Sequence, residues 1–476
     1  MKKNRNNKKN KNIFIAICIT LVFLALTLAS FMKIDPDYFW HIKAGEYMLK
    51  HGPINHDVFS WYVNSKYWMS HEWLFEVILA SLKCVFGKAH VFIYIFSCLL
   101  GLLFFLFLSN KESYMKNIPY TMFYMLFFFL TGIGFTQARP YLISFILLAI
   151  TIYFLIDLYK NEDSKKIYFL PLITIIWANV HGGSSNLPYL LCLVFIIGGL
   201  FSFKFEKIEA EKLSKLQLKK YLITMILCMV AVCINIHGFK MFLYPYLNMM
   251  DTTMLQNISE WRSTSLNESY HYMYFAFLLF IIITMLLSRK KIRFIDFLLL
   301  GFVAYLGLKS IRFWFYTYIV MSYVVFDYVD EHEVDKGTIP CLLAICLTLF
   351  ISFLFDFDRV IKPTYKLNLD KEVVNTIKKL KPKRLFNMYD YGGELIYNDI
   401  KVFIDGRADL YTNYNYKDYL DISNLNKDTK KLINKYNFDY LLVNNNYPIQ
   451  VYLQSNSNYD LVYNKGNIYI YKKIVN

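Results

Sequence analysis

Apolar stretches of about twenty residues recur along almost the whole chain, and this repetition limits the fold more than any other feature. A hydrocarbon core about 30 Å thick is crossed by about twenty apolar residues of α-helix. Apolar residues make up 56% of the 476 residues, and aromatic residues alone make up 19%. The sequence therefore predicts a polytopic α-helical membrane protein.

We expect about eleven membrane spans. The first, residues 13–32, follows a basic stretch that resembles the front of a signal peptide. The segment behind it is acidic and aromatic and has no small-residue cleavage pattern, so we expect an uncleaved span. The expected spans are 13–32, 90–109, 118–135, 141–158, 167–182, 187–203, 221–237, 272–288, 295–310, 314–328 and 338–355.

The distribution of lysine and arginine predicts the orientation of these spans. With residues 1–12 in the cytoplasm, the most basic internal loops, 204–220 and 289–293, also lie on the cytoplasmic side. An odd number of spans then places the C-terminus outside the cell membrane. The net charge of +16 does not make nucleic acid an expected partner, because the lysines cluster in short loops between spans, where orienting the chain in the membrane explains them.

The hydropathy changes beyond residue 356, where alternating runs such as KVFIDG and FDYLLVN predict short strands between helical patterns. Residues 464–466, NKG, predict a hairpin turn. Asp405, Gly406 and Arg407 follow an expected strand, where ligand-contacting loops often lie, and the favoured interpretation is an internal Asp405–Arg407 pair that stabilises this loop. The expected domains are a basic cytoplasmic tail (1–12), a transmembrane domain (13–357) with a long first outer loop (33–89), and a soluble extracytoplasmic α/β domain (358–476).

Two classes of site are disfavoured. The eight cysteines lie in apolar stretches or in an amphipathic segment, which argues against a disulfide framework or a thiolate metal site. The sequence contains no Gly-rich phosphate loop and no Ser-His-Asp order, so a soluble nucleotide-sugar enzyme is not expected.

Two carboxylates, Asp35 and Asp37, lie directly after the first span. Acids at this position are costly unless they perform chemistry or hold a cation, so both are candidate catalytic residues. One of them would act as a general base or hold a divalent ion such as Mg²⁺ or Mn²⁺. The plainer alternative is that they cap the following segment or pair with Lys33 and Lys43.

Ionisable residues from distant parts of the chain fall at the outer ends of the expected spans, as a single outward-facing polar cavity requires. The plainer alternatives are helix termination, helix entry and interfacial anchoring. The candidate substrate-binding residues are His41, Asp57, His71, Glu72, Arg139, His181, His237, Glu260 and Arg312.

The first outer loop ends in HEWLFEVILASLKCVFG, where apolar residues recur at helical spacing beside Glu72, Glu76 and Lys83. This pattern predicts a helix lying along the membrane surface. The helix would either form the wall of a lateral opening for a lipid substrate or pack over the helical bundle.

The Asp-Pro-x-aromatic-aromatic element after the first span, the long first outer loop, about eleven spans and a C-terminal outer domain together resemble the C-type (GT-C) membrane glycosyltransferases. That group includes the oligosaccharyltransferase catalytic subunit and the protein O-mannosyltransferases. The elements DPDYFWHIKAGEYML, HDVFSW, HEWL, ARPYL, WANVHGG, IHGFKMFLYP, SEWRS and FIDGRADLY resemble more closely a bacterial branch of uncharacterised multi-span proteins labelled glycosyltransferase-like.

The resemblance implies a sugar donor linked to polyprenyl phosphate and a glycan, lipid or protein acceptor at the outer surface of the bilayer. Asp35 matches the aspartate before proline in the oligosaccharyltransferase pattern, whereas the asparagine, tyrosine and arginine that follow there are absent. Arg139 and Arg312 suit a leaving phosphate because a guanidinium donates two parallel hydrogen bonds.

The expected reaction is an inverting displacement at the sugar. His181 and His237 would add hydrogen-bond donors to the phosphate. Asp35 or Asp37 should then lie within roughly 10–12 Å of Arg139, Arg312 or His181. The competing functions are a lipid-linked glycan transporter or flippase, a polymer ligase, and a non-catalytic cell-envelope assembly protein.

Overall fold

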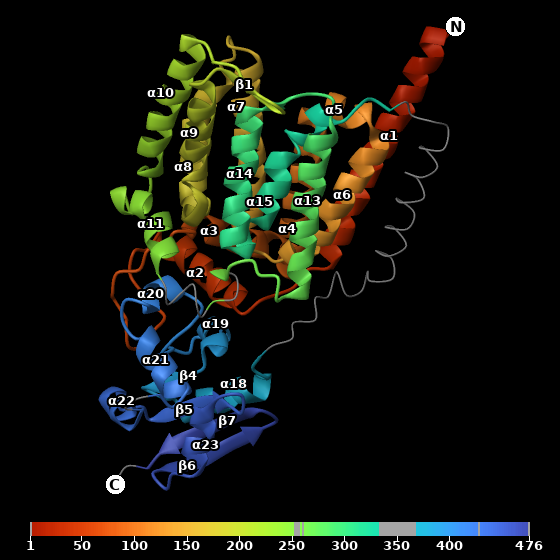
Figure 1. Cartoon of the computed structure of the whole chain (residues 1–476). Coiled ribbons are helices and arrows are strands. Elements are labelled where there is room, and N and C mark those ends of the chain that lie inside the picture. The colour runs from red at the N-terminus through yellow and green to blue at the C-terminus, as the bar shows by residue number, and fades with distance from the viewer. Residues whose placement is uncertain (1, 252–257, 259–260, 333–367, 427–428, 475–476) are drawn as a thin grey trace. The chain divides into compact units, whose positions relative to one another are not determined.

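The computed structural model describes residues 2–251, 258, 261–332, 368–426 and 429–474 (Figure 1). The expected span 338–355 and the candidate residue Glu260 lie outside these residues. The chain divides into two compact units. Unit 1 comprises Met1–Lys33 and Phe86–Pro363, and unit 2 comprises Ile34–Val85 and Thr364–Asn476.

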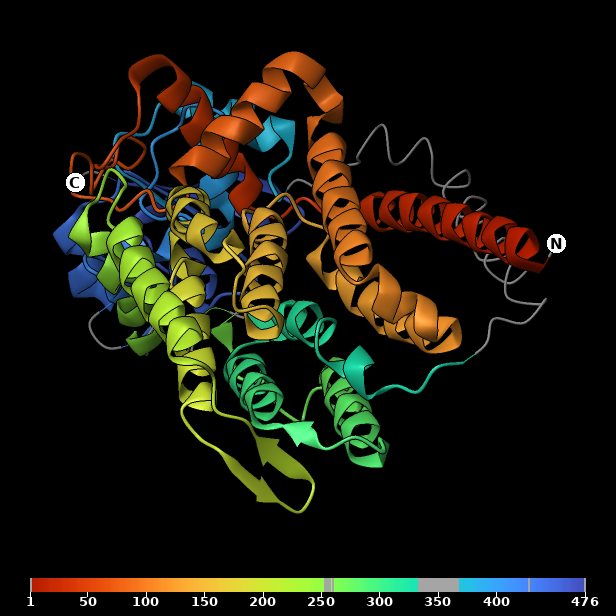
Figure 2. The same cartoon turned by 90° about the horizontal axis from the view of Figure 1, so that it is seen from above.

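Unit 1 is a bundle of apolar helices (Figures 1 and 2). Helix α1 packs along α4, α4 along α7, and α9 along α10, which also contacts α8. The bounds are α1 (Lys2–Ser30), α4 (His90–Ser109), α5 (Lys111–Lys116), α6 (Ile118–Gly132), α7 (Tyr141–Lys160), α8 (Leu170–Val180), α9 (Leu187–Gly199), α10 (Lys215–Val232), α11 (Phe239–Met250), α13 (Tyr272–Leu287), α14 (Phe294–Lys309) and α15 (Trp314–Met321).

Within the described residues, six helical stretches are long and apolar enough to cross a membrane. The expectation of a membrane protein built from apolar helices is thereby confirmed. The number of about eleven spans stays a prediction, because α10, α14 and α15 coincide with expected spans but are shorter or less apolar. The six are Ile13–Ser30, Trp73–Ser109, Ile118–Phe135, Tyr141–Lys160, Gly182–Gly199 and Ser269–Leu287, and Lys166–Val180 is a shorter apolar helix.

The stretch Trp73–Ser109 consists of two helices, α3 (Trp73–Phe86) and α4, joined by one turn of 3-10 helix at Gly87–Ala89. Gly87 has a φ of +53°, a conformation that favours glycine. The helix expected over this part of the first outer loop therefore exists, and it ends where the next expected span begins. Its position along the membrane surface stays a prediction.

Three short strands in unit 1 were not expected from the sequence: β1 (Phe203–Phe205), β2 (Ile208–Ala210) and β3 (Ile292–Arg293). Strand β2 pairs antiparallel with β1 and parallel with β3. The sheet joins the basic loops 204–220 and 289–293, so both loops lie at the same end of the bundle. Their location on the cytoplasmic side of the membrane stays a prediction.

Unit 2 is an α/β fold around a sheet of order β4-β5-β7-β6 in the described part of the chain. Strands β4 and β5 are parallel, and β6 and β7 form the expected hairpin, with Gly466 at a φ of +58°. The bounds are α2 (Asp37–His51), α3, α18 (Lys371–Leu380), β4 (Leu385–Asn387), α19 (Gly392–Tyr397), α20 (Ala408–Tyr411), α21 (Tyr416–Ser423), α22 (Thr429–Tyr436), β5 (Tyr440–Asn444), α23 (Pro448–Gln454), β6 (Tyr459–Lys465) and β7 (Ile468–Lys473).

The core of unit 2 contains side chains from the first outer loop as well as from the C-terminal region. Trp40, Phe59 and Trp68 pack in the same buried cluster as Phe386 and Phe403. The grouping differs from the expected one, in which residues 33–89 belonged with the spans and residues 358–476 stood alone. The physical reason is the burial of large aromatic side chains from the loop. If the C-terminal region folded alone, these side chains would be exposed to water.

Candidate functional site

The candidate catalytic acids lie at the start of α2, in unit 2. Oδ1 of Asp35 accepts the backbone N–H groups of Asp37 at 2.9 Å and Tyr38 at 3.1 Å. This carboxylate oxygen therefore caps the first turn of α2, as the plainer alternative for Asp35 required. Of the two acids, Asp37 is accordingly the better candidate for chemistry.

The Asp37 carboxylate lies against the backbone of Gly406, at the start of the loop between Ile404 and α20. A Cβ atom on Gly406 would come within 1.6 Å of Oδ1 of Asp37 and within 3.0 Å of Nε1 of Trp40. Only glycine leaves room for this approach. The carboxylate and the indole N–H therefore both lie beside Gly406.

Two aromatic side chains complete this arrangement. Trp40 is 5% exposed, and its Nε1 is buried without a hydrogen-bond partner in the described structure. The hydroxyl of Tyr389 donates to the carbonyl oxygen of Gly406 at 3.2 Å. Burial, followed by the charge of Asp37, raises the pKa of Tyr389 well above its ordinary value, so this side chain is a neutral donor.

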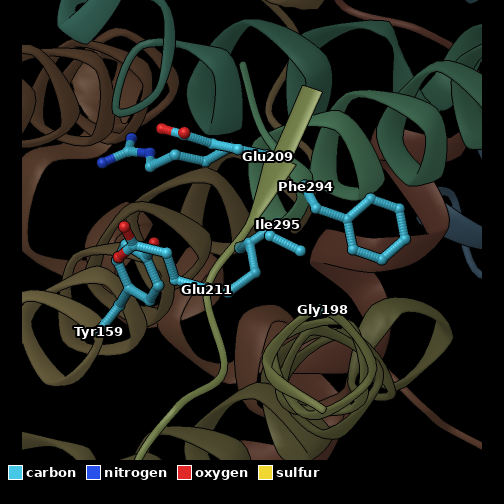
Figure 3. A pocket seen from close by; sticks show the side chains of 8 residues that line it. Tyr159, Gly198, Glu209, Glu211, Phe294 and Ile295 are labelled. Carbon is cyan, nitrogen blue, oxygen red and sulfur yellow. The ribbon is translucent and has the colours of Figure 1, made fainter. Parts of the chain in front are cut away.

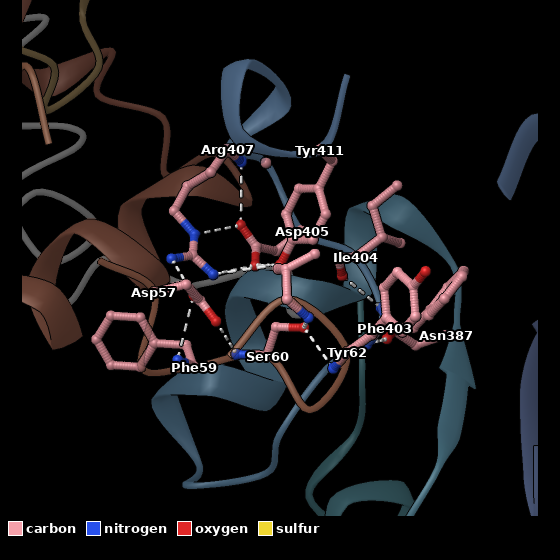
Figure 4. Close-up of polar contacts among 12 residues, drawn as sticks. Asp57, Phe59, Ser60, Tyr62, Asn387, Phe403, Ile404, Asp405, Arg407 and Tyr411 are labelled. Atoms are coloured by element: carbon pink, nitrogen blue, oxygen red, sulfur yellow. Dashed lines mark hydrogen bonds and ion pairs between the residues drawn. The ribbon is translucent and has the colours of Figure 1, made fainter. Parts of the chain in front are cut away.

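The loop that contains Gly406 is fixed by a buried ion network (Figure 4). Arg407 donates to Asp405 at 2.7–2.8 Å and to Asp57 at 2.6 Å, and all three side chains are buried. The expected pairing of Asp405 with Arg407 is thus observed. Asp57, a candidate substrate-binding residue, belongs to this network and is 0% exposed, and its role in substrate binding stays a prediction.

His41, His71 and Glu72, three further candidates, come together in a second buried network of unit 2. Glu72 lies 3.1 Å from Nε2 of His71 and 3.5 Å from Nε2 of His41. Nδ1 of His41 lies 3.1 Å from Glu76, a residue that was not among the candidates. Burial alone would lower the pKa of His71, but the carboxylates of Glu72 and Asp409 raise it above its ordinary value.

In unit 1, His181 and Arg312 are in direct contact, 2.9 Å apart between Nε2 and Nη2. A guanidinium only donates, so Nε2 of His181 accepts, and Nδ1 carries the proton. Nδ1 lies 2.7 Å from Oγ of Ser144 and 2.9 Å from Oγ of Ser184. His181 is therefore a neutral imidazole that orients Arg312, whose guanidinium also lies 5.1 Å from the ring centre of Trp261.

The remaining candidates of unit 1 lie in connections between helices. Arg139 precedes α7, and its carbonyl oxygen accepts the hydroxyl of Tyr94 at 2.8 Å. His237 lies between α10 and α11, directly before Gly238, which has a φ of +55°. Helix α10 already ends at Val232, and Gly238 is the residue directly before α11, so the helix-termination alternative for His237 is not observed. The expected separation between the acids and Arg139, Arg312 or His181 stays a prediction.

A cavity of about 210 Å³ lies in unit 1 where α14 begins (Figure 3). Helix α14 begins at this cavity and ends near Arg312, about 24 Å away for 16 residues of helix. Arg293 is paired with Asp296 at 2.6 Å and Asp327 at 2.7 Å, so its charge is compensated within the protein. Arg312 and the cavity therefore lie at opposite ends of α14. The cavity is lined by Tyr159, Gly198, Glu209, Ala210, Glu211, Arg293, Phe294 and Ile295.

No group of three or more His, Cys, Asp or Glu side chains in the described ranges is arranged to hold a metal ion. A divalent ion at Asp35 or Asp37 stays a prediction. The one carboxylate oxygen of Asp35 that caps α2 already accepts two N–H groups. The sequence did not single out Trp40 or Tyr389, whereas it placed Gly406 in a loop after a strand, where ligand-contacting loops often lie.

No protein-family model and no curated protein matches the sequence. Solved structures do match. The oligosaccharyltransferase of Archaeoglobus fulgidus, tethered to an acceptor peptide with the NVT sequon, aligns with a TM-score of 0.51 and 11% identity, over 89% of this chain and 68% of that chain. Its apo form aligns with a TM-score of 0.50 and 10% identity, over 91% and 69%.

A third structure, the oligosaccharyltransferase AglB of the same archaeon with an inhibitory peptide and a dolichol-phosphate, aligns with a TM-score of 0.53 and 10% identity, over 92% and 70%. At this identity the likeness establishes the fold. The chain therefore has a fold similar to that of the archaeal oligosaccharyltransferase, a GT-C fold.

Proposed function

We propose that the protein is a membrane glycosyltransferase that moves a sugar from a polyprenyl-phosphate donor to an acceptor at the outer face of the cytoplasmic membrane. The observation that carries this proposal is the position of Asp37. Its carboxylate lies at the start of α2, against Gly406 and beside Trp40, in a chain whose fold is similar to that of an oligosaccharyltransferase. The N-terminus is cytoplasmic in this proposal, and unit 2 is extracytoplasmic.

The proposed roles follow from the chemistry of each group. Asp37 accepts the proton of the acceptor as it attacks the anomeric carbon. Arg312 receives the negative charge of the leaving lipid phosphate, and His181 orients Arg312 through the hydrogen bond between them. A magnesium or manganese ion at Asp37 would add positive charge to the donor phosphate.

Donor consumption by the purified protein in lipid tests the proposal. Given a panel of labelled polyprenyl-phosphate hexoses and pentoses, the wild-type protein is expected to consume at least one. Asp37→Asn should lower the rate by about 100-fold or more, because the base is removed. Asp35→Asn should cost stability and lower the rate less, because its carboxylate oxygen caps α2.

Asp399→Asn is the matched control, because Asp399 is an exposed acid of unit 2 that pairs with Lys43 at 2.6 Å. It should retain wild-type turnover. If Asp37→Asn consumes donor as fast as the wild type, Asp37 is not the base. If the wild type binds lipid-linked sugars and moves them across vesicle membranes without cleaving them, the protein is a transporter instead.

A further inference from the structure

We propose that the indole N–H of Trp40 binds the attacking oxygen of the acceptor, and that the acceptor group is a hydroxyl. This inference rests on the proposed function, because it assigns the acceptor class of the same site. It concerns a residue that the reaction outlined above does not use.

The indole N–H of Trp40 is a buried donor that the described part of the protein leaves unsatisfied. Its Nε1 has no hydrogen-bond partner, although more than nine-tenths of the residue is buried. Buried indole N–H groups in proteins ordinarily find a partner, and an unpaired one is destabilising. An unpaired donor beside the proposed base is accounted for when the ligand supplies the partner.

The direction of this N–H group is fixed by its surroundings. The ring of Trp40 lies on the ring of His41, with centroids 3.6 Å apart, and meets Trp68 edge-on with centroids 6.1 Å apart. His41 is held in turn between Glu72 and Glu76. The buried network of histidines and glutamates therefore positions Trp40, and the indole cannot turn toward another acceptor.

Nε1 of Trp40 and Oδ1 of Asp37 both lie within 3.0 Å of a single point, the position of a Cβ on Gly406. The distances of 1.6 Å and 3.0 Å from that point place Oδ1 and Nε1 at most 4.6 Å apart, a separation that one oxygen about 2.8 Å from each atom can bridge. That atom must accept a hydrogen bond from Trp40 and donate one to Asp37. A hydroxyl oxygen does both, whereas the lone pair of an amide nitrogen is delocalised and accepts no hydrogen bond.

The resulting step is balanced. The hydroxyl proton passes to the Asp37 carboxylate while the oxygen forms a bond to the anomeric carbon. The bond between that carbon and the phosphate oxygen breaks, and its electron pair remains on the lipid phosphate. The Trp40 N–H holds the oxygen in line and is not consumed. Trp40 is thus an acceptor-binding residue, and the step needs no further reactant.

The test compares Trp40→Phe with Trp61→Phe in the full-length protein in lipid. Nε1 of Trp61 donates to the carbonyl oxygen of Leu385 at 2.9 Å, in the same core. Trp61→Phe loses a satisfied hydrogen bond, so it should lower the unfolding temperature and retain wild-type transfer kinetics. Trp40→Phe loses an unpaired donor, so it should retain or raise the unfolding temperature.

The kinetic readout uses the donor panel with glycerol, methyl hexosides and a serine peptide as hydroxyl acceptors, and an asparagine peptide as the amide acceptor. Trp40→Phe should lower kcat/KM for hydroxyl acceptors by about tenfold, the effect of one hydrogen bond, without changing the KM of the donor. Hydrolysis should slow equally, because water is also a hydroxyl acceptor. The asparagine peptide should receive no sugar.

The outcomes separate the two proposals. If the donor is consumed and Trp40→Phe transfers and hydrolyses at wild-type rates, this inference is wrong and the proposed function stands. The same conclusion follows if the asparagine peptide is the acceptor. If the wild type consumes no donor, the proposed function fails and this inference fails with it.

Discussion

At the scale of single residues, Gly406 matters because of what its missing side chain allows. The carboxylate of Asp37 occupies the space that any Cβ at position 406 would need, as the contact of 1.6 Å indicates. The φ of Gly406 is not in the left-handed region, so the requirement for glycine comes from this close approach alone. The residue therefore sets the position of Asp37.

Gly406→Ala should accordingly displace the carboxylate and leave the fold intact. The first atoms that the new Cβ meets belong to the tip of the Asp37 side chain, which can rotate away, so the loss of stability should be about 1 kcal/mol. Donor turnover should fall by about 100-fold, because small displacements of a reacting group have effects of this size. Measurements of donor turnover and of unfolding temperature on the same preparation check the loss of activity and the loss of stability.

Gly393→Ala provides the contrast. A Cβ on Gly393 would come within 2.2 Å of the carbonyl oxygen of Pro36, a backbone atom that cannot rotate away. This variant should lose more stability than Gly406→Ala. Wild-type turnover by Gly406→Ala would show that the position of the Asp37 carboxylate is unimportant for the reaction.

At the scale of elements, α19 carries a buried carboxylate that makes the stability of unit 2 depend on pH. Glu394 accepts the backbone N–H groups of Asn368 at 2.7 Å and Leu369 at 3.0 Å. Burial nevertheless raises the pKa of Glu394 to about 7. Because the folded state holds the proton more tightly, its contribution to stability is complete below about pH 4.5 and is lost as the pH rises through about 7.

Hydrogen exchange of the β5 amides in the full-length protein should therefore show less protection at pH 8 than at pH 5, after correction for the intrinsic exchange rate. Glu394→Gln resembles the protonated acid and should reduce this difference. Glu372→Gln, at an exposed carboxylate whose pKa Lys465 lowers, should leave it unchanged. If the wild type and Glu394→Gln lose protection equally between pH 5 and pH 8, Glu394 is not the group that makes the stability depend on pH.

The elements also show what the sequence could predict. Apolar length identified the helices that could span a membrane, and helical spacing identified α3, because both signals are local. The alternating runs predicted the strands of unit 2. The sheet that joins the basic loops was missed, since its strands are only two or three residues long and pair across the sequence.

Only the local features of the site were predictable from the sequence. Asp37 stood out because an acid after a membrane span is unusual, and the Asp405–Arg407 pair is local. The contacts of Gly406 with Asp37 and Trp40 bridge more than 360 positions, and no periodicity records such a contact. The ion pair between Asp57 and Arg407 inside the core was likewise not predicted, because 350 positions separate the two residues.

At the scale of the whole molecule, the chain leaves unit 1 after Lys33 and returns to it at Phe86. The segment Ile34–Val85, together with the C-terminal region, forms unit 2. Asp37 belongs to unit 2, whereas Arg312 and His181 belong to unit 1. The proposed reaction therefore assigns the base and the phosphate-binding arginine to different folding units.

The most direct test of this account is donor turnover by Arg312→Gln beside Asp37→Asn. The account predicts that both variants keep the wild-type unfolding temperature to within a few degrees and that each loses donor consumption by about 100-fold or more. Removing the charge of Arg312 should also raise the donor KM, whereas Asp37→Asn should leave the donor KM unchanged. Wild-type turnover by both variants would contradict the account.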